Sequence, residues 1–90
     1  MDRRISSLDW SLVRAFLAVA DCGSLSAAAR RLGASQPTLG RQIRQLETDL
    51  QQALFHRQAK GLVLTENGQL LIGPARRMQA ALNEIELTAA

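Results

Sequence analysis

The chain has 90 residues, of which 47% are hydrophobic and only 3% aromatic. This length allows one small domain, and a composition rich in Ala and Leu favours packed helices over a β-sandwich. Cys22 is the single cysteine, which excludes an intramolecular disulfide. No signal peptide and no apolar run long enough to cross a bilayer is recognisable, so we expect a soluble protein of the reducing cytoplasm.

Positive charge is concentrated in the middle of the chain. Residues 1–21 are neutral overall, residues 30–60 carry six cationic side chains against Glu47 and Asp49, and residues 61–90 carry a net charge of −1. A basic segment between neutral ends is typical of a nucleic-acid surface, although a run of charge more often only solvates a face. The charge pattern therefore needs the support of a motif.

The first helix is predicted to follow Asp9, which can cap its N-terminus, and to end at Gly23, which can adopt the left-handed conformation. Cys22 lies beside that end, and nothing near it in sequence would activate the thiol, so we interpret it as a small buried residue. The apolar positions recur at helical spacing and predict a face turned toward the core. They are Leu12, Phe16, Val19 and Ala20.

A second, short helix is predicted from an N-cap at Ser26 to Leu32, where Gly33 can end it. Ala28 and Ala29 have side chains so small that the following helix can cross closely. Two short helices joined by a tight turn match the helix-turn-helix pattern. Any tight helical hairpin would show the same features. The composition of the next helix therefore has to distinguish a DNA-binding helix-turn-helix from an ordinary helical hairpin.

The helix predicted for residues 35–50 distinguishes these two interpretations. Ser35 can cap it, and Pro37 falls in its first turn, where a missing N–H costs nothing. At about 100° per residue, Arg41 and Arg44 lie opposite the apolar stripe, while Gln36 can reach past the helix end. The apolar stripe consists of Leu39, Ile43, Leu46 and Leu50.

Arginine and glutamine are the side chains that make bidentate contacts with guanine and adenine edges. We therefore interpret residues 35–50 as a recognition helix for the major groove rather than as a helix with a merely solvated polar face. Gly40 is unusual there, because glycine inside a helix costs about 1 kcal/mol relative to alanine. Either Gly40 allows the backbone to approach a phosphate closely, which we favour slightly, or it is a neutral replacement.

Residues 54–65 read LFHRQAKGLVLT and predict a short β-hairpin. Arg57 and Lys60 lie near its tip, and a cationic hairpin beside a recognition helix can act as a wing that meets phosphates or the minor groove. His56 has no companion ligand at a suitable spacing, so we expect an exposed strand residue and no metal site. The residues expected to face the core are Phe55, Leu62 and Leu64.

The last helix is predicted to be capped by Thr65, and Pro74 should bend it or start it locally. Its apolar residues recur in alternating steps of four and three, a spacing typical of a seam between two helices. The same stripe can also pack against its own domain, and we expect the first turns to face inward and the later turns to face a partner. The stripe consists of Leu71, Ala75, Met78, Leu82 and Ile85.

Taken in order, these parts resemble the N-terminal DNA-binding domain of LysR-type transcriptional regulators, over residues 8–78. The matching pieces are AFLAVADCGSLSAAARRLGASQPTLGRQIRQLE, LFHR and LTENG. The resemblance implies a mostly α-helical fold: a winged helix-turn-helix of three helices and a hairpin over residues 1–65, and a linker helix over residues 66–90. It also implies that the linker helix pairs two subunits into a homodimer, and that the full-length protein is a tetramer.

The resemblance further implies a bacterial cytoplasmic protein associated with the nucleoid, with no cofactor in this domain. A small effector would bind a separate C-terminal domain, so we expect these residues to belong to a longer regulator. Carried over by position, the resemblance assigns a phosphate contact to Ser26 and a wing contact to Arg57. Arg44 and Lys60 join this DNA-contacting set on the helical and hairpin patterns alone. The groove-facing residues that it assigns are Ser35, Gln36, Pro37, Thr38 and Arg41.

The sequence departs from the family pattern at three positions. Gly40 stands where the family often has serine, so one hydroxyl contact with DNA is expected to be missing. Gln51 stands where a glycine commonly ends the recognition helix, so that helix should either run on or be strained. Ala59 replaces a frequent wing glycine, which leaves the shape of the hairpin tip open.

Other classes of function fit the sequence less well. No paired carboxylates, nucleophile–base pair or phosphate-binding glycine loop is recognisable, so we expect no enzyme. A winged helix that binds another protein is the main rival, but it would favour an acidic or apolar recognition face instead of a basic one. RNA binding is disfavoured because exposed aromatic residues for base stacking are missing. The sequence therefore predicts regulation of transcription by a dimer on an interrupted palindrome in double-stranded DNA.

Overall fold

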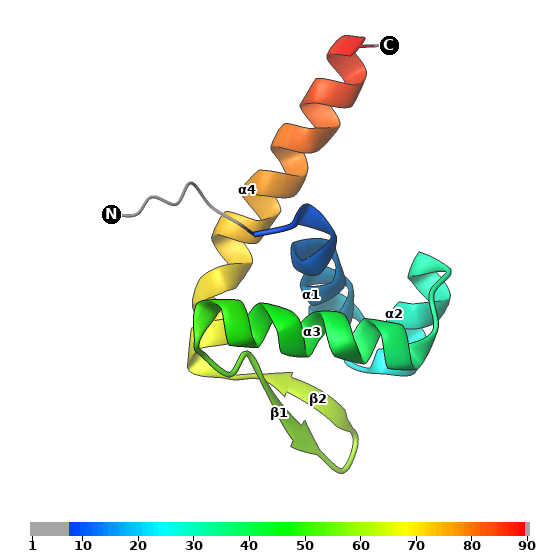
Figure 1. Ribbon diagram of the computed structural model, residues 1–90, viewed down its shortest axis with the longest axis vertical. Helices are drawn as coiled ribbons and strands as arrows, with labels where there is room; N and C mark the ends of the chain where they lie inside the picture. Colours follow the sequence, from blue (N-terminus) through cyan, green and yellow to red (C-terminus); the bar gives the residue numbers. More distant parts are fainter. Residues whose placement is uncertain (1–7, 90) are drawn as a thin grey trace.

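The computed structural model describes residues 8–89, and in this part of the chain four helices and one β-hairpin follow one another. Helices α1, α2 and α3 form a compact body, the hairpin lies beside α3, and α4 rises away from both (Figure 1). The bounds are α1 Trp10–Cys22, α2 Leu25–Leu32, α3 Gln36–Leu50, β1 Phe55–Gln58, β2 Gly61–Leu64 and α4 Glu66–Ala89. The predicted fold class is confirmed.

Three of the four predicted N-caps are confirmed by their hydrogen bonds. The Asp9 carboxylate accepts from the Ser11 amide at 3.0 Å, and the Ser35 hydroxyl accepts from the Thr38 amide at 3.2 Å. The Thr65 hydroxyl accepts from the Gly68 amide at 2.9 Å. These short polar side chains satisfy amides that a helix N-terminus leaves without an intrahelical partner.

The fourth N-cap prediction, Ser26, is wrong. Ser24 is the cap, with an extended backbone and a hydroxyl that accepts from the Ala27 amide at 3.2 Å, and α2 begins at Leu25. Gly23 closes α1 in the left-handed conformation, and the next residue is already placed to begin a new helix. Starting α2 one residue after Ser24 also brings the Leu25 side chain against the core.

The two unusual helix positions differ in outcome. Helix α3 ends at Leu50, and Gln51 caps it in the left-handed region at φ 56°, the only described residue other than glycine with a positive φ. Of the two predictions for Gln51, strain is therefore correct and continuation is wrong. Pro74 lies inside α4, so the prediction that it could start the helix is wrong, because α4 begins at Glu66, directly after its cap Thr65.

The core is centred on α1, which packs against α2, α3 and α4. Phe16 is fully buried and its ring lies 5.5 Å from that of Phe55 in the hairpin, measured between ring centroids. Leu39 and Leu46 of α3 are fully buried against α1, as their spacing predicted. The prediction for Ala20 is wrong, because it is only half-buried and is not part of the core cluster. The other predicted core positions belong to the cluster or pack against it, and Ala28 and Ala29 of α2 join them; the predicted positions are Leu12, Val19, Ile43, Leu50, Leu62 and Leu64.

The hairpin pairs Phe55 with Leu64 and Gln58 with Gly61, which leaves a two-residue turn at Ala59 and Lys60. Its second strand is fastened to the α1–α2 turn, because the Leu62 amide donates to the Gly23 carbonyl at 3.1 Å. Gly61 has a φ of 133°, and a Cβ added there would overlap that same carbonyl oxygen. Glycine is thus required at this position for the hairpin to lie so close to the helical body.

Helix α4 begins against the body and then leaves it. Ala75 is only 2% exposed, and Arg76 donates to the Asp21 carboxylate of α1 at 2.6 Å. Beyond Arg76, among residues 8–89, no hydrogen bond or ion pair connects α4 to another element. None of the described helices is long and apolar enough to cross a membrane.

Candidate nucleic-acid interface

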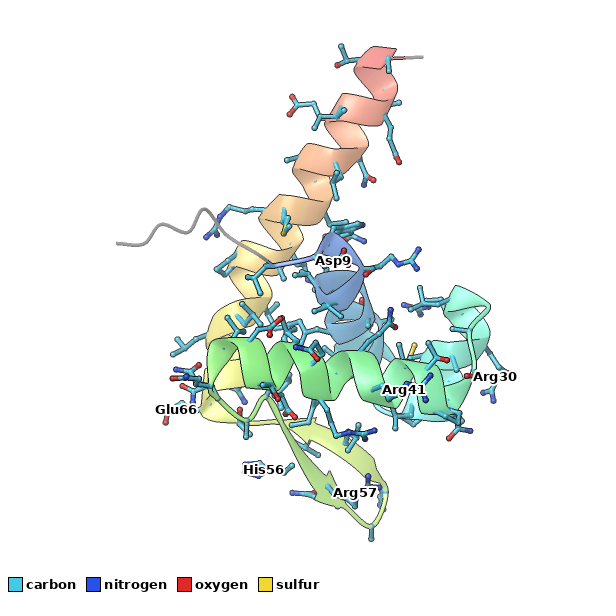
Figure 2. All side chains as sticks on the ribbon, viewed as in Figure 1. Asp9, Arg30, Arg41, His56, Arg57 and Glu66 are labelled. Carbon is cyan, nitrogen blue, oxygen red and sulfur yellow. The ribbon has the colours of Figure 1, made fainter. Side chains whose placement is uncertain are left out.

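The exposed face of α3 is the starting point of the candidate site. Arg41 and Arg44 point outward while Ile43 and Leu46, on the opposite side of the helix, are buried. Figure 2 shows Arg41 on the outer face of α3 and Arg57 on the hairpin below it. The amphipathic spacing of α3 therefore produces the orientation that the sequence predicted.

A shallow depression runs along this face at the N-terminal end of α3. It combines two uncharged residues of the first turn, two arginines and an apolar floor supplied in part by α2. Its volume is about 600 Å³, and it is lined by Leu25, Gln36, Pro37, Gly40, Arg41 and Arg44. Four predicted contact residues, Gln36, Pro37, Arg41 and Arg44, are thus brought together on one surface.

The remaining two residues of the predicted groove set, Ser35 and Thr38, form the start of α3 and connect to Arg41. The Ser35 hydroxyl donates to the Thr38 hydroxyl oxygen at 2.9 Å, and Arg41 Nη2 donates to the same oxygen at 3.2 Å. The Ser35 hydroxyl also accepts a hydrogen bond from the Thr38 amide. These hydrogen bonds therefore form one short chain from the N-cap to the Arg41 guanidinium group.

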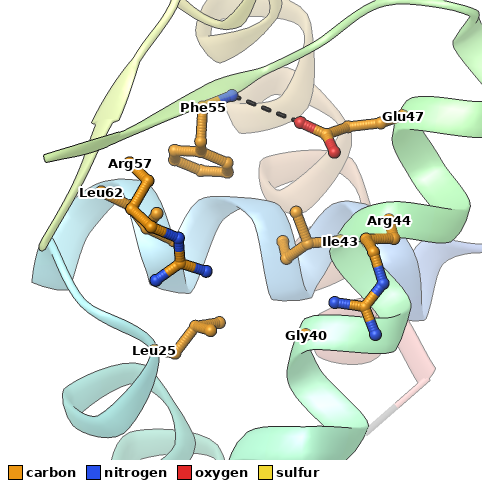
Figure 3. A pocket seen from close by; sticks show the side chains of 8 residues that line it. All are labelled: Leu25, Gly40, Ile43, Arg44, Glu47, Phe55, Arg57 and Leu62. Atoms are coloured by element: carbon orange, nitrogen blue, oxygen red, sulfur yellow. Dashed lines mark hydrogen bonds between the residues drawn. The ribbon is translucent and has the colours of Figure 1, made fainter.

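A second cleft lies between α3 and the hairpin. The guanidinium groups of Arg44 and Arg57 approach it from the two sides, over a floor that includes Leu25, Ile43 and Phe55 (Figure 3). The volume of this cleft is about 190 Å³, and it shares Leu25, Gly40 and Arg44 with the depression above. The recognition helix and the hairpin therefore present one connected basic face.

The arginines of this face carry uncompensated charge. Within residues 8–89, neither Arg41, Arg44 nor Arg57 forms an ion pair with a carboxylate. The nearby acid Glu47 is committed elsewhere, because its Oε2 accepts from the backbone amides of Leu54 at 2.7 Å and Phe55 at 3.4 Å. A surface with unpaired cations and occupied carboxylates attracts an anionic partner.

Two further acidic groups of the body are also engaged in contacts. Asp21 lies within 3.8 Å of Arg31 and 2.6 Å of Arg76, and its hydrogen bond with Arg76 lowers the pKa of the Asp21 carboxyl below its ordinary value of 3.8. Asp49 accepts a hydrogen bond from Gln45 at 2.8 Å. These contacts stabilise the scaffold and leave the arginines of the basic face exposed.

Three further residues singled out by the sequence lie outside both clefts. Lys60 is exposed in the hairpin turn, and His56 is exposed on β1. Ser26 is the second residue of α2 and is partly buried. No group of three or more His, Cys, Asp or Glu in the described part of the chain could hold a metal ion.

Sequence reasoning missed Leu25, Glu47 and Gly61 as residues that shape the site. Leu25 lines both clefts, Glu47 fastens the start of the hairpin, and Gly61 lets the hairpin reach the α1–α2 turn. The partners of Glu47 lie seven and eight residues along the chain, and that of Gly61 lies on another element. Helical periodicity and turn signals carry no information about such contacts.

Comparison with known proteins places this geometry in a family. The model of the bacterial regulatory helix-turn-helix proteins of the lysR family matches residues 10–69, which covers α1 to the start of α4. The chain belongs to the LysR family. Its helices and hairpin form the winged helix-turn-helix domain of this family, and the resemblance seen in the sequence is confirmed.

Individual LysR proteins show the same relationship. The transcriptional regulator ClcR of Pseudomonas putida is 45% identical over 71 residues, which cover 79% of this chain and 24% of ClcR. The structure of the CbnR DNA-binding domain in complex with DNA has a TM-score of 0.83 at 35% identity, and the match covers 88% of this chain and 91% of that domain. The BenM DNA-binding domain bound to the benA site has a TM-score of 0.85 at 27% identity, with 91% and 92% covered.

The chain thus spans about a quarter of the length of ClcR. Its likeness to the isolated DNA-binding domains of CbnR and BenM extends over nearly their whole length. The chain therefore corresponds to one domain of these longer regulators.

Proposed function

We propose that this chain binds double-stranded DNA sequence-specifically, as the DNA-binding domain of a LysR-type transcriptional regulator. The observation that carries the proposal is the connected basic face, on which Arg41, Arg44 and Arg57 line two adjoining clefts without carboxylate partners. Helix α3 is the second helix of the helix-turn-helix, the element that such motifs insert into the major groove. The DNA complexes of the CbnR and BenM domains support the same role.

In the proposed complex, the first turns of α3 enter the major groove, where Gln36 and Arg41 meet base edges. Arg57 and Lys60 on the hairpin meet the phosphate backbone or the minor groove. The role is one of binding rather than catalysis, in keeping with relatives that are transcriptional regulators.

Salt dependence separates DNA binding from the rival function, a winged helix that binds protein. Fluorescence anisotropy of a labelled duplex at increasing salt should give an affinity that falls steeply, with a log–log slope of about −0.9 per phosphate neutralised. A chain that binds no duplex even at low salt would contradict the proposal.

Arg41→Ala tests base reading. Because a bidentate contact with a base edge contributes about 1–3 kcal/mol, specific binding should weaken by that amount and preference should relax at one position of each half-site. Arg30→Ala is the matched control, since it removes the same charge from α2 outside both clefts. An equal loss on specific and random duplexes would reduce Arg41 to a phosphate contact.

Arg57→Ala and Lys60→Ala test the wing. Each should lower affinity for all sequences and reduce the magnitude of the salt slope by about one, because each removes one phosphate contact. Gln58→Ala, an exposed neutral residue of the same hairpin, should leave the slope unchanged. Unchanged slopes in both charged variants would remove the hairpin from the interface.

We further propose that two copies of the chain pair through α4 and read an interrupted palindrome. Of the predicted seam residues, Leu71 packs against the core and Ala75 lies within it, so the proposed seam begins farther along the helix. Met78 is 37% and Ile85 62% exposed, with Leu82 between them on the same face. In a single chain Met78 and Ile85 are exposed and Leu82 is half-buried, which supports burial of this stripe in a pair.

Sedimentation of the double variant Met78→Glu, Leu82→Glu tests the pairing. Four like charges would enter the seam of the pair, so the variant should be monomeric, keep its helical content and lose its preference for two half-sites. Glutamate at Ala80 and Asn83, which face away from the stripe at about 100° per residue, is the control and should leave the pair intact. A dimeric double variant would show that the subunits pair elsewhere.

A regulator of this family is further proposed to bind its effector outside residues 8–89. Both clefts of the basic face contain arginines assigned to DNA, which supports an effector site elsewhere in a longer protein. The isolated chain should therefore bind duplex DNA in plain buffer with no added small molecule. A requirement for a small molecule in that assay would contradict this assignment.

A further inference from the structure

We propose that Thr38 is a positioning residue that holds the Arg41 guanidinium ready for base reading, an inference that rests on the proposed DNA-binding function. The juxtaposition is specific: Ser35 and Arg41 both donate to the Thr38 hydroxyl oxygen, at 2.9 and 3.2 Å. Arg41 thus has a defined partner before any DNA arrives.

The hydrogen-bonding capacity of these groups limits what Thr38 can do. A hydroxyl group offers two acceptor positions and one donor, and Ser35 and Arg41 occupy both acceptor positions of Thr38. Thr38 therefore cannot also accept a hydrogen bond from the amino group of adenine or cytosine while the chain is intact. The only capacity of the hydroxyl that these two bonds leave open is its own hydrogen, whereas Arg41 keeps several N–H donors for a base edge.

The anchor for this chain is the backbone of the helix itself. The Ser35 hydroxyl accepts from the Thr38 amide at 3.2 Å, which fixes the Ser35 side chain at the N-terminus of α3. The Ser35 hydroxyl then donates to the Thr38 hydroxyl oxygen, and Arg41 Nη2 donates to that same oxygen. The outer end of a long, exposed side chain is thereby connected to a rigid element.

Such a connection matters because a free arginine side chain samples many rotamers and loses that freedom when it binds. A guanidinium group has five N–H donors, so the single bond to Thr38 leaves donors available for the edge of a guanine. Arg44 has no side-chain hydrogen bond in the described part of the chain, although it lies on the same face. Arg41 is therefore better prepared for directional contacts, and Arg44 for a less directional contact with phosphate.

The test begins with selection of duplexes from a random library by the wild-type chain and by Arg41→Ala. The base position whose preference disappears in Arg41→Ala is the position that Arg41 reads. Thr38→Val keeps the shape of the side chain and removes its hydroxyl. It should lower discrimination at that position by about 3- to 10-fold, which is less than a full hydrogen bond with a charged group contributes, because the variant loses the positioning of Arg41 and keeps its guanidinium. Thr38→Ser, which keeps the hydroxyl, should restore most of that discrimination.

A double-mutant cycle distinguishes positioning from direct contact. In the Arg41→Ala background, Thr38→Val should cause no further loss of discrimination, since there is no guanidinium left to hold. Helical content and the midpoint of urea unfolding are measured for each variant to remove effects of a weakened helix start.

Each remaining outcome is decisive. Wild-type discrimination in Thr38→Val, or the same loss with and without Arg41, overturns the positioning role and leaves the proposed function intact. The same holds if no base position depends on Arg41. A wild-type chain that enriches no sequence overturns the proposed function itself.

Discussion

Helices α1 and α4 both carry many apolar side chains, and they differ in what covers them. In α1, seven of 13 residues are buried, and α2, α3, α4 and the hairpin surround the helix. In α4, only Gly68 and Ala75 of 24 residues are buried, while Ile85 and Leu87 are 62% and 78% exposed. An apolar stripe at helical spacing thus indicates a face that needs a partner, but it does not say whether the partner belongs to the same chain.

The difference has consequences for folding and for assembly. Residues of α1 contribute to the stability of a single chain, because burial of apolar surface contributes about 25 cal/mol per Å². Exposed residues of α4 can contribute only when a second molecule covers them. The boundary between the part of α4 that packs on its own domain and the part that is exposed lies near Arg76. Arg76 is the last residue of α4 that forms a hydrogen bond with the body.

The largest effect is expected from a truncation in the core. Phe16→Ala should lower the free energy of unfolding by about 3–5 kcal/mol, a large part of the stability of a small domain, because Phe16 is fully buried against Phe55. Ile85→Ala should change the stability of the monomer by less than about 0.5 kcal/mol. Urea unfolding at protein concentrations low enough to exclude association compares the two, and equal losses would abolish the contrast between α1 and α4.

A pair of glycines in α4 gives the next largest effect. A Cβ at Gly68 would overlap the Leu54 carbonyl oxygen and lie 2.9 Å from Leu64 Cδ2, so Gly68→Ala should destabilise the fold by about 1–3 kcal/mol. At Gly73, apart from the adjoining residues and backbone of α4, an added Cβ would meet the Arg77 side chain at an ordinary 3.5 Å. Alanine favours the helix by up to about 1 kcal/mol relative to glycine, but a Cβ on the residue before Pro74 crowds the proline ring. Gly73→Ala should therefore change the stability by less than about 1 kcal/mol.

Thermal unfolding of the two variants would locate the joint between α4 and the body. A clear loss of stability in Gly68→Ala and little change in Gly73→Ala are expected if the first turn of α4 is tightly packed and the turn at Gly73 is not. If both variants are stabilised, the first turn of α4 is more loosely packed than the structure indicates.

Gly40→Ala tests the packing around a helical glycine in α3, within the body of the domain. A Cβ there would lie 3.5 Å from Arg44 Nη1 and 3.8 Å from Leu25 Cδ1, both ordinary contacts, so the substitution should stabilise α3 by about 0.5–1 kcal/mol. Because Gly40 lines both clefts, the same variant should bind duplex DNA more weakly if the backbone of α3 approaches the DNA there. A gain in stability with unchanged binding would make Gly40 a neutral replacement.

The smallest effect concerns the last link between the body and α4. The hydrogen bond with Arg76 lowers the pKa of the Asp21 carboxyl below 3.8, so this contact stabilises the fold above that pH. Its contribution is lost as the pH falls below 3.8 and through the lower pKa of the folded state. A carbon-detected NMR titration should show the Asp21 pKa rising in Arg76→Ala, and an unchanged pKa would show that this contact does not form in solution.

Much of the fold follows from short stretches of sequence. Asp9, Ser35 and Thr65 cap helices because a short polar side chain reaches an amide two or three residues along the chain. The stripe of Leu39, Ile43 and Leu46 identifies the buried side of α3, and the outward direction of Arg41 and Arg44 then follows from helical geometry. Family motifs in the same stretches indicated the role of the domain.

The prediction for Ser26 shows where local signals fail. Ser24 and Ser26 are equally good caps by residue type, and the choice between them depends on where the Gly23 turn leaves the chain and on how Leu25 meets the core. The energies of the two caps are too similar for the sequence to separate them. Packing of residues distant in the chain makes the choice.

By itself the sequence determined the order of the elements, most of their ends, the buried and exposed faces of α3 and membership of the LysR family. Only the tertiary structure decided how the hairpin is held, through Glu47 on one side and the Gly23–Gly61 contact on the other. It also decided that the inner part of the α4 stripe is covered while Met78 and Ile85 are exposed. The reason is that periodicity and capping arise from interactions within a few residues, whereas these features depend on contacts between elements that only the folded chain brings together.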